Sequence, residues 1–141
     1  MALPNRIGLI TLACRDVERM TRFLRDVGWP ETPASDAQHR TFQCTNGVVV
    51  ALYDAKHYEP ELGPVTGGFR GFVLSVNVES MDEVRRLHAT LSDVDGAEIL
   101  EAPQEAFWGG GFAWRDPEGN LWDVAWAKGA TLDDRGGVHF P

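Results

Sequence analysis

The sequence predicts an α+β fold of two tandem βαβββ modules, whose curled mixed sheets enclose a ligand trough. The first reason is a repeat: residues 9–29 and residues 71–91 each consist of an apolar strand, a short polar break and a helix. The second reason is that a meander of strands follows each repeat. A single module of this kind cannot bury its own sheet, so the two copies are expected to pair within one domain.

Composition sets the boundaries within that single domain, residues 1–141. We place the first module at residues 6–54 and the second at residues 71–127. Residues 55–70 are rich in Gly and Pro, which predicts an exposed linker loop. Residues 128–141 predict a loosely ordered tail.

Each predicted helix has an N-cap and one apolar stripe. Asp16 is the expected N-cap of the first helix, and Ser80 is that of the second, where Glu83 completes a capping box. Apolar side chains then recur at helical spacing, which favours one buried face per helix. They are Met20, Phe23, Leu24 and Val27 in the first helix, and Met81, Val84, Leu87, Leu91 and Val94 in the second.

A hairpin is predicted in each meander. Residues 42–53 contain Asn46-Gly47, a dipeptide typical of a two-residue type I′ turn. Residues 112–126 contain the longer turn Asp-Pro-Glu-Gly-Asn, and residues 98–103 supply an additional strand.

Composition also excludes several classes of function. The net charge of −8 argues against binding to nucleic acid or to an anionic membrane, because phosphates would be repelled; it is compatible with a cationic ligand. No apolar run approaches the roughly 18 residues of a membrane span, and the N-terminus lacks a signal-peptide pattern, so we expect a cytoplasmic location. Two cysteines, Cys14 and Cys44, make neither a disulfide framework nor a metal knuckle.

Asp123 is the main candidate functional residue, because it interrupts an apolar strand between Trp122 and Val124. Alternation turns these two neighbours toward the helices and Asp123 toward the trough. Asp123 then pairs with Arg115, a backbone N–H or water, or it anchors a ligand's amine or hydroxyl, or it acts as a general base. The same alternation gives the other ligand-binding candidates on the strands: Thr11, Phe42, Tyr53, Ser75 and Arg115.

Two aromatic residues outside the strands are further candidates. Trp108 lies beside three glycines, and Tyr58 lies in the linker. Loops often carry binding residues, so both side chains are expected to cover the trough and to stack on a flat ligand.

Three motifs carry a resemblance to a known family. They are RDVERMTRFL (15–24), WGGGF (108–112) and DPEGNLWDV (116–124). With the repeated organisation, they resemble the vicinal oxygen chelate superfamily, which includes glyoxalase I, extradiol dioxygenases and bleomycin-resistance proteins. The resemblance covers roughly residues 6 to 127. It implies the glyoxalase/bleomycin-resistance fold and a homodimer.

In the metal-dependent members of that superfamily, each half supplies two ligands, one from its first strand and one from its last. The matching positions here are Leu9, Ala51, Gly71 and Asp123. Only Asp123 has a metal-binding side chain, so neither a metal nor another cofactor is expected. A relocated site that joins His39 or His57 to Asp123 stays open.

Two functions follow. The leading hypothesis is a metal-independent protein that binds or sequesters a small aromatic or cationic molecule in the apolar trough, as bleomycin-resistance proteins do. The alternative is a glyoxalase-like lyase, isomerase or other enzyme of the superfamily that uses Asp123 as the base, either without metal or with a non-standard metal site. Whether the chain is an enzyme is left open at this point.

Overall fold

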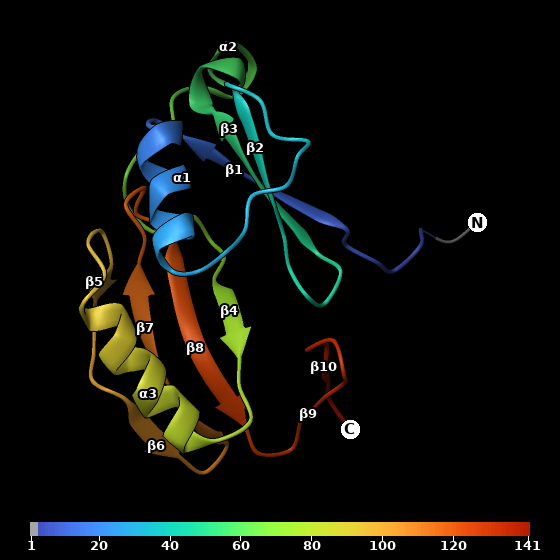
Figure 1. Cartoon of the computed structure of the whole chain (residues 1–141), viewed down its shortest axis with the longest axis vertical. Helices are drawn as coiled ribbons and strands as arrows, with labels where there is room; N and C mark the ends of the chain where they lie inside the picture. Colours follow the sequence, from blue (N-terminus) through green and yellow to red (C-terminus); the bar gives the residue numbers. More distant parts are fainter. Residues whose placement is uncertain (1–2) are drawn as a thin grey trace. The chain divides into compact units, whose positions relative to one another are not determined.

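The computed structural model describes residues 3–141 and confirms the α+β fold with mixed sheets. The chain forms two compact units that meet in sequence between Val65 and Thr66. This boundary falls inside the predicted linker. Each unit contains one main sheet and one long helix, as the repeat predicts (Figure 1).

The first unit has a three-stranded sheet in the order β1-β3-β2. Its elements are β1 (Leu9–Cys14), α1 (Val17–Asp26), β2 (His39–Gln43) and β3 (Val49–Asp54). Strand β1 is parallel to β3, and β2 is antiparallel to it. Helix α1 begins as predicted, because the Asp16 carboxylate accepts a hydrogen bond from the Arg19 amide at 3.0 Å. Its apolar stripe is buried at Met20, Phe23 and Leu24.

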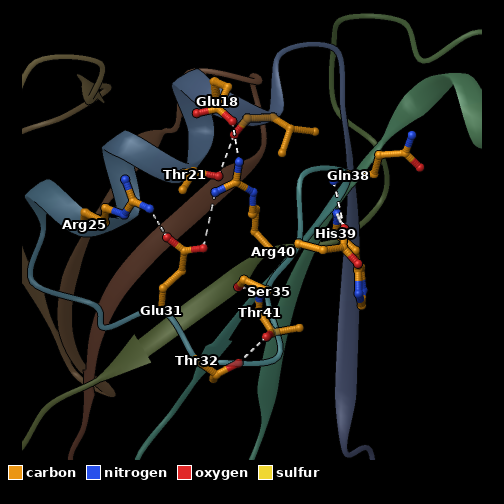
Figure 2. A network of polar contacts seen from close by, with 12 residues as sticks. Glu18, Thr21, Arg25, Glu31, Thr32, Ser35, Gln38, His39, Arg40 and Thr41 are labelled. Atoms are coloured by element: carbon orange, nitrogen blue, oxygen red, sulfur yellow. Dashed lines mark hydrogen bonds and ion pairs between the residues drawn. The ribbon is translucent and has the colours of Figure 1, made fainter.

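Arg40 ties β2 to α1 and to the segment between them (Figure 2). Its guanidinium bonds Glu18 of α1 and lies 3.5 Å from Glu31, which also bonds Arg25. Burial opposes ionisation of Glu31, but hydrogen bonds from Arg25, Ser35 and Arg40 hold its pKa below the usual value of 4.5. Arg40 therefore lies on the face of β2 that is turned toward α1.

The hairpin between β2 and β3 differs from the prediction by one residue. Its loop has three residues, 45–47, because the Cys44 amide donates to the Val48 carbonyl at 2.8 Å. Gly47 has a φ of 96°, which suits the left-handed position that closes such a loop. The predicted two-residue turn at Asn46-Gly47 is therefore wrong.

This change of register reverses the face on which Phe42 lies. A two-residue turn would have placed Phe42 opposite Ala51, whereas it pairs with Val50 and is fully buried. A slip of one residue moves every side chain of a strand to the other face. The prediction that Phe42 shares a face with Ala51 and Tyr53 is wrong, because Phe42 lies on the face of Arg40.

The second unit has a sheet in the order β4-β8-β7-β5, with β6 also paired to β7. Its elements are β4 (Leu74–Asn77), α3 (Met81–Ser92), β5 (Glu98–Ile99), β6 (Gln104–Ala106), β7 (Gly109–Arg115) and β8 (Leu121–Ala127). The N-cap predicted at Ser80 is confirmed, but the reciprocal bond of the predicted capping box goes to the amide of Glu79 rather than to that of Ser80. The Ser80 hydroxyl accepts from the Glu83 amide at 3.1 Å, and the Glu83 carboxylate accepts from the Glu79 amide at 2.8 Å.

Helix α3 covers one face of β7 and β8 (Figure 1), and the even-numbered residues of these strands form the core beneath it. Trp114 and Trp122 stack with ring centroids 5.1 Å apart, and His88 of α3 meets Phe112 edge-on at 5.0 Å. Trp122 and Val124 are almost fully buried. The predicted alternation of β8 is therefore confirmed at these two residues.

The three glycines of the WGGGF motif are required by close packing. A Cβ on Gly109 would lie 1.7 Å from the Trp126 carbonyl oxygen, and one on Gly111 would lie 2.4 Å from the Val124 carbonyl oxygen. A Cβ on Gly110 would lie 2.4 Å from the Met81 sulfur. These glycines let β8 and α3 approach β7.

The Asp-Pro-Glu-Gly-Asn turn is organised by the buried carboxylate of Asp116. It accepts hydrogen bonds from the amide of Glu118 at 2.8 Å, from the backbone and side chain of Asn120 at 3.1 and 2.9 Å, and from the Trp122 indole at 2.8 Å. Arg70 closes the turn by donating to Asn120 Oδ1 at 2.6 Å and to the Glu118 carbonyl at 3.0 Å. The turn thus fixes the start of β8.

Two segments predicted as irregular contain regular structure. The linker holds a 3₁₀ turn η1 (Ala55–His57) and a short helix α2 (Glu59–Leu62), where Asp54 caps the first. The tail forms a hairpin of β9 (Thr131–Leu132) and β10 (Val138–His139). Among residues 3–141, no helix has the length and apolar character that crossing a bilayer requires.

Candidate functional site

Asp123 lies at the centre of β8 on the face turned away from α3. Its partner in the parallel ladder is Ser75 of β4, and its partner in the antiparallel ladder is Ala113 of β7. Directly paired residues share a face of a sheet, so these three define the helix-distal face of the second unit. Successive side chains of a strand point to opposite faces of the sheet. Because Trp122 and Val124 point toward α3, Asp123 points away from it.

The Asp123 carboxylate is held in an unusual electrostatic state. Its Oδ1 atom is buried and has no hydrogen-bond partner among the described residues. Burial raises the pKa of the carboxyl, a hydrogen bond from the Ser75 hydroxyl partly offsets this, and the nearby Glu101 charge raises it further. Glu101 reaches the site from the segment after β5, where its carboxylate accepts from the Ala113 amide at 3.2 Å.

Arg115 does not neutralise Asp123. Its guanidinium instead lies 3.3 Å from the carboxylate of Glu98, its exposed neighbour on β5. The alternative in which Arg115 pairs with Asp123 is therefore wrong. The register explains this, because Glu98 is directly opposite Arg115 whereas Asp123 is only its diagonal neighbour. Glu101 was not among the predicted residues, since only the register of β5 and β7 brings it near Asp123.

In the first unit, the structure brings Tyr53 and Tyr58 together. Their ring centroids are 5.7 Å apart, and Tyr53 also contacts His57 at 4.5 Å and His39 at 5.1 Å. The sequence patterns predicted the two tyrosines as separate candidates and did not connect either histidine with them. His39 pairs directly with Tyr53, so the correct hairpin register would have revealed that contact.

The remaining candidates lie as follows. Thr11 pairs with Ala51 on the face of Tyr53, and its side chain is exposed. Trp108 precedes β7, is 48% exposed, and its carbonyl accepts from the Lys128 amide at 2.8 Å. Five residues of extended chain separate Trp108 from Ala113, which is about 17 Å along the strand. Trp108 therefore lies at one end of the second sheet, well away from Asp123.

Comparison with known proteins identifies the family to which the chain belongs. A family model for the Glyoxalase/Bleomycin resistance protein/Dioxygenase superfamily matches residues 6–124. The chain belongs to this superfamily. Comparison with proteins of curated function finds no match.

Solved structures of the superfamily share the fold. A glyoxalase-related enzyme from Fulvimarina pelagi is 25% identical, with a TM-score of 0.83 over 96% of this chain and 98% of that one. A glyoxalase/bleomycin resistance protein/dioxygenase family enzyme from Burkholderia phytofirmans is 21% identical, with a TM-score of 0.74 over 85% and 97%. A lactoylglutathione lyase from Agrobacterium tumefaciens is 20% identical, with a TM-score of 0.66 over 87% and 94%.

Most side chains at the positions that correspond to metal ligands in the metal-dependent superfamily members are not metal ligands. The parallel strand pair β1–β3 of the first unit corresponds to the parallel pair β4–β8 of the second. Thr11 pairs with Ala51 in the first, and Ser75 pairs with Asp123 in the second. Of these four side chains, only Asp123 is a strong ligand for a divalent ion. Gly71, matched to a ligand position from the sequence, lies outside β4. Among residues 3–141, no group of three or more His, Cys, Asp and Glu side chains is arranged to hold a metal ion.

Proposed function

We propose that this superfamily member binds a small aromatic or cationic molecule without a metal, and that Asp123 is its polar anchor. The observation that carries the proposal is the buried Oδ1 of Asp123, which lacks a hydrogen-bond partner among the described residues. Such an atom is costly to leave unpaired, so a ligand N–H or O–H that reaches it gains a strong hydrogen bond.

A cation fits this anchor better than a neutral or anionic molecule. Glu101 adds a second negative charge beside Asp123, and the guanidinium of Arg115, its diagonal neighbour on β7, is already paired with Glu98. A bound ammonium or iminium group would favour the ionised form of Asp123 and offset the effect of burial on its pKa. The net charge of −8 attracts such ligands over longer distances.

Calorimetric titration with proflavine, a flat aromatic cation, tests the proposal. We expect saturable binding by the wild type and a loss of affinity of about 10-fold or more in Asp123→Asn, because a hydrogen bond to a charged group contributes about 1.5–3 kcal/mol. Asp95→Asn, which removes an exposed carboxylate of the same unit, is the matched control and should bind like the wild type. Equal affinity of Asp123→Asn and the wild type would refute the anchor.

Metal independence has its own measurement. The purified protein should bind proflavine equally before and after dialysis against EDTA, and elemental analysis should find less than stoichiometric Ni, Zn, Fe or Mn. A metal present at one equivalent per chain, whose removal abolishes binding, would contradict this part of the proposal.

A metal-free enzyme is the second candidate, and the state of Asp123 favours it specifically. A carboxyl whose pKa is raised by burial lies closer to neutrality, where a general base is most effective, and its Oδ1 is available to take a proton. The test is exchange of the carbon-bound hydrogens of hydroxyacetone in D₂O, followed by NMR. Exchange that depends on Asp123, and that is absent in Asp123→Asn, would establish catalysis over simple binding.

The proposal extends to a homodimer, which the family resemblance implies. Sedimentation equilibrium should then give twice the chain mass of 15.6 kDa. A monomer at micromolar concentration would contradict it.

A further inference from the structure

The second unit contains a cavity outside the Asp123 site. Its volume is about 250 Å³, and it lies where β4 and β8 end and the tail hairpin begins. The lining residues that matter here are Asn77, Glu79, Trp126, Thr131, Leu132 and Val138. Asn77 pairs with Ala125, two residues along the same parallel ladder from the pair of Ser75 and Asp123. The cavity therefore uses the same two strands as the Asp123 site but not its carboxylate.

One wall of this cavity is the C-terminal hairpin, which is internally braced. The Asp133 carboxylate accepts hydrogen bonds from the amides of Arg135 and Gly137, both at 2.9 Å, and lies 2.9 Å from His139 Nε2. These contacts hold the pKa of Asp133 at about 2. Leu132 and Val138 pair across the hairpin and both line the cavity. The wall therefore needs no ligand to form.

The chemistry of the lining favours a ring that carries a positive charge. Trp126 is one of the lining residues, and the Lys128 ammonium 5.7 Å from its ring centre shows that this indole is accessible to a cation. The side chains of Asn77 and Glu79 have no hydrogen-bond or ion-pair partner among the described residues, although the Glu79 amide donates to the Glu83 carboxylate. A donor on the ligand can therefore reach a free amide oxygen and a free carboxylate.

We propose that this cavity is a second small-molecule site, which takes a single-ring aromatic amine. The ring would pack against Trp126, Leu132 and Val138, and the ammonium group would bond Glu79. The size agrees, since an apolar cavity of about 150 Å³ accommodates benzene, and a larger one accommodates a substituted ring. The site is independent of the function proposed for Asp123.

The experiment compares benzylamine with benzyl alcohol by calorimetric titration of the full chain. Benzylamine should bind more tightly, and Glu79→Gln should weaken benzylamine about five-fold while leaving benzyl alcohol unchanged, because exposed ion pairs contribute at most about this factor. Ala130→Trp, which fills the cavity from its lining, should abolish binding of both. Glu61→Gln removes an exposed carboxylate of the first unit and is the matched control.

Three results would overturn the proposal: no preference for benzylamine, full binding in Ala130→Trp, or equal losses in Glu79→Gln and Glu61→Gln. Asp123→Asn separates the two sites. Benzylamine binding that remains in this variant and is weakened by Glu79→Gln belongs to the cavity, whereas complete loss of binding in Asp123→Asn would assign the amine to Asp123 instead. If Ala130→Trp fails to fold, as judged by circular dichroism, the Glu79→Gln comparison decides alone.

Discussion

Replacing Asp123 with Asn should make the protein more stable at neutral pH and leave it unchanged in acid. The substitution keeps the shape of the side chain and the hydrogen bond from Ser75 but removes the charge. The amide leaves the same position unpaired but carries no charge, and an unpaired buried group costs about 1–3 kcal/mol when it is neutral and more when it is charged. Asp123 is only half-buried, so solvent screens part of this cost, and we expect a gain of about 1 kcal/mol. For a chain of this length that is a rise in Tm of about 3–4 °C.

The pH dependence of this stability difference follows from the direction in which the pKa of Asp123 is shifted. The pKa of Asp123 is raised in the folded protein above the ordinary value of 3.8. Below pH 3.8 both folded and unfolded chains hold the proton, so wild type and Asp123→Asn should be equally stable. As the pH rises, the unfolded chain releases the proton first, and the wild type loses stability until the folded pKa has been passed.

Urea unfolding followed by tryptophan fluorescence, at pH 3.0 and pH 7.5, measures both effects. The difference between Asp123→Asn and the wild type should be clear at pH 7.5 and close to zero at pH 3.0. Asp95→Asn should show no such dependence. A variant less stable than the wild type at pH 7.5 would refute the reasoning, because it would mean that the Asp123 carboxylate gains more from a partner than it loses by burial.

Three further predictions concern the parts of the second unit that position this site. Gly111→Ala should lower the free energy of unfolding by about 2 kcal/mol, because its Cβ would meet the Val124 carbonyl, whereas Gly129→Ala has open space and should be neutral in the same urea titration. Asp116→Ala should lower the free energy of unfolding by at least about 3 kcal/mol, because it leaves four hydrogen-bond donors without their acceptor. Unchanged stability would show that water replaces the carboxylate. The pKa of Asp133 is lowered to about 2, so the tail hairpin should be fully stable above pH 3.8 and lose protection in amide exchange as the pH falls toward 2. Protection that persists at pH 2 would contradict this.

Local patterns in the sequence predicted the elements of this fold. The N-caps at Asp16 and Ser80 and the alternation around Trp122 and Val124 are realised, and so is most of each apolar stripe, of which only Val27 and Val94 lie beyond the ends of their helices. Each depends on neighbours within a few residues, where backbone geometry dictates which side chains meet. The position of Asp123 on the helix-distal face belongs to the same class of inference.

Other features were decided only when strands met in the tertiary structure. The loop of the first hairpin is longer by one residue than its Asn-Gly dipeptide suggests, and this alone moved Phe42 into the core. Glu98, rather than Asp123, became the partner of Arg115, and Glu101 came within reach of Asp123, because of how β5 pairs with β7. Register is set by packing and turn geometry over the whole sheet, so a single strand cannot specify it. The sequence determined that an acid would face away from α3, but which charges surround that acid was decided by strand pairing.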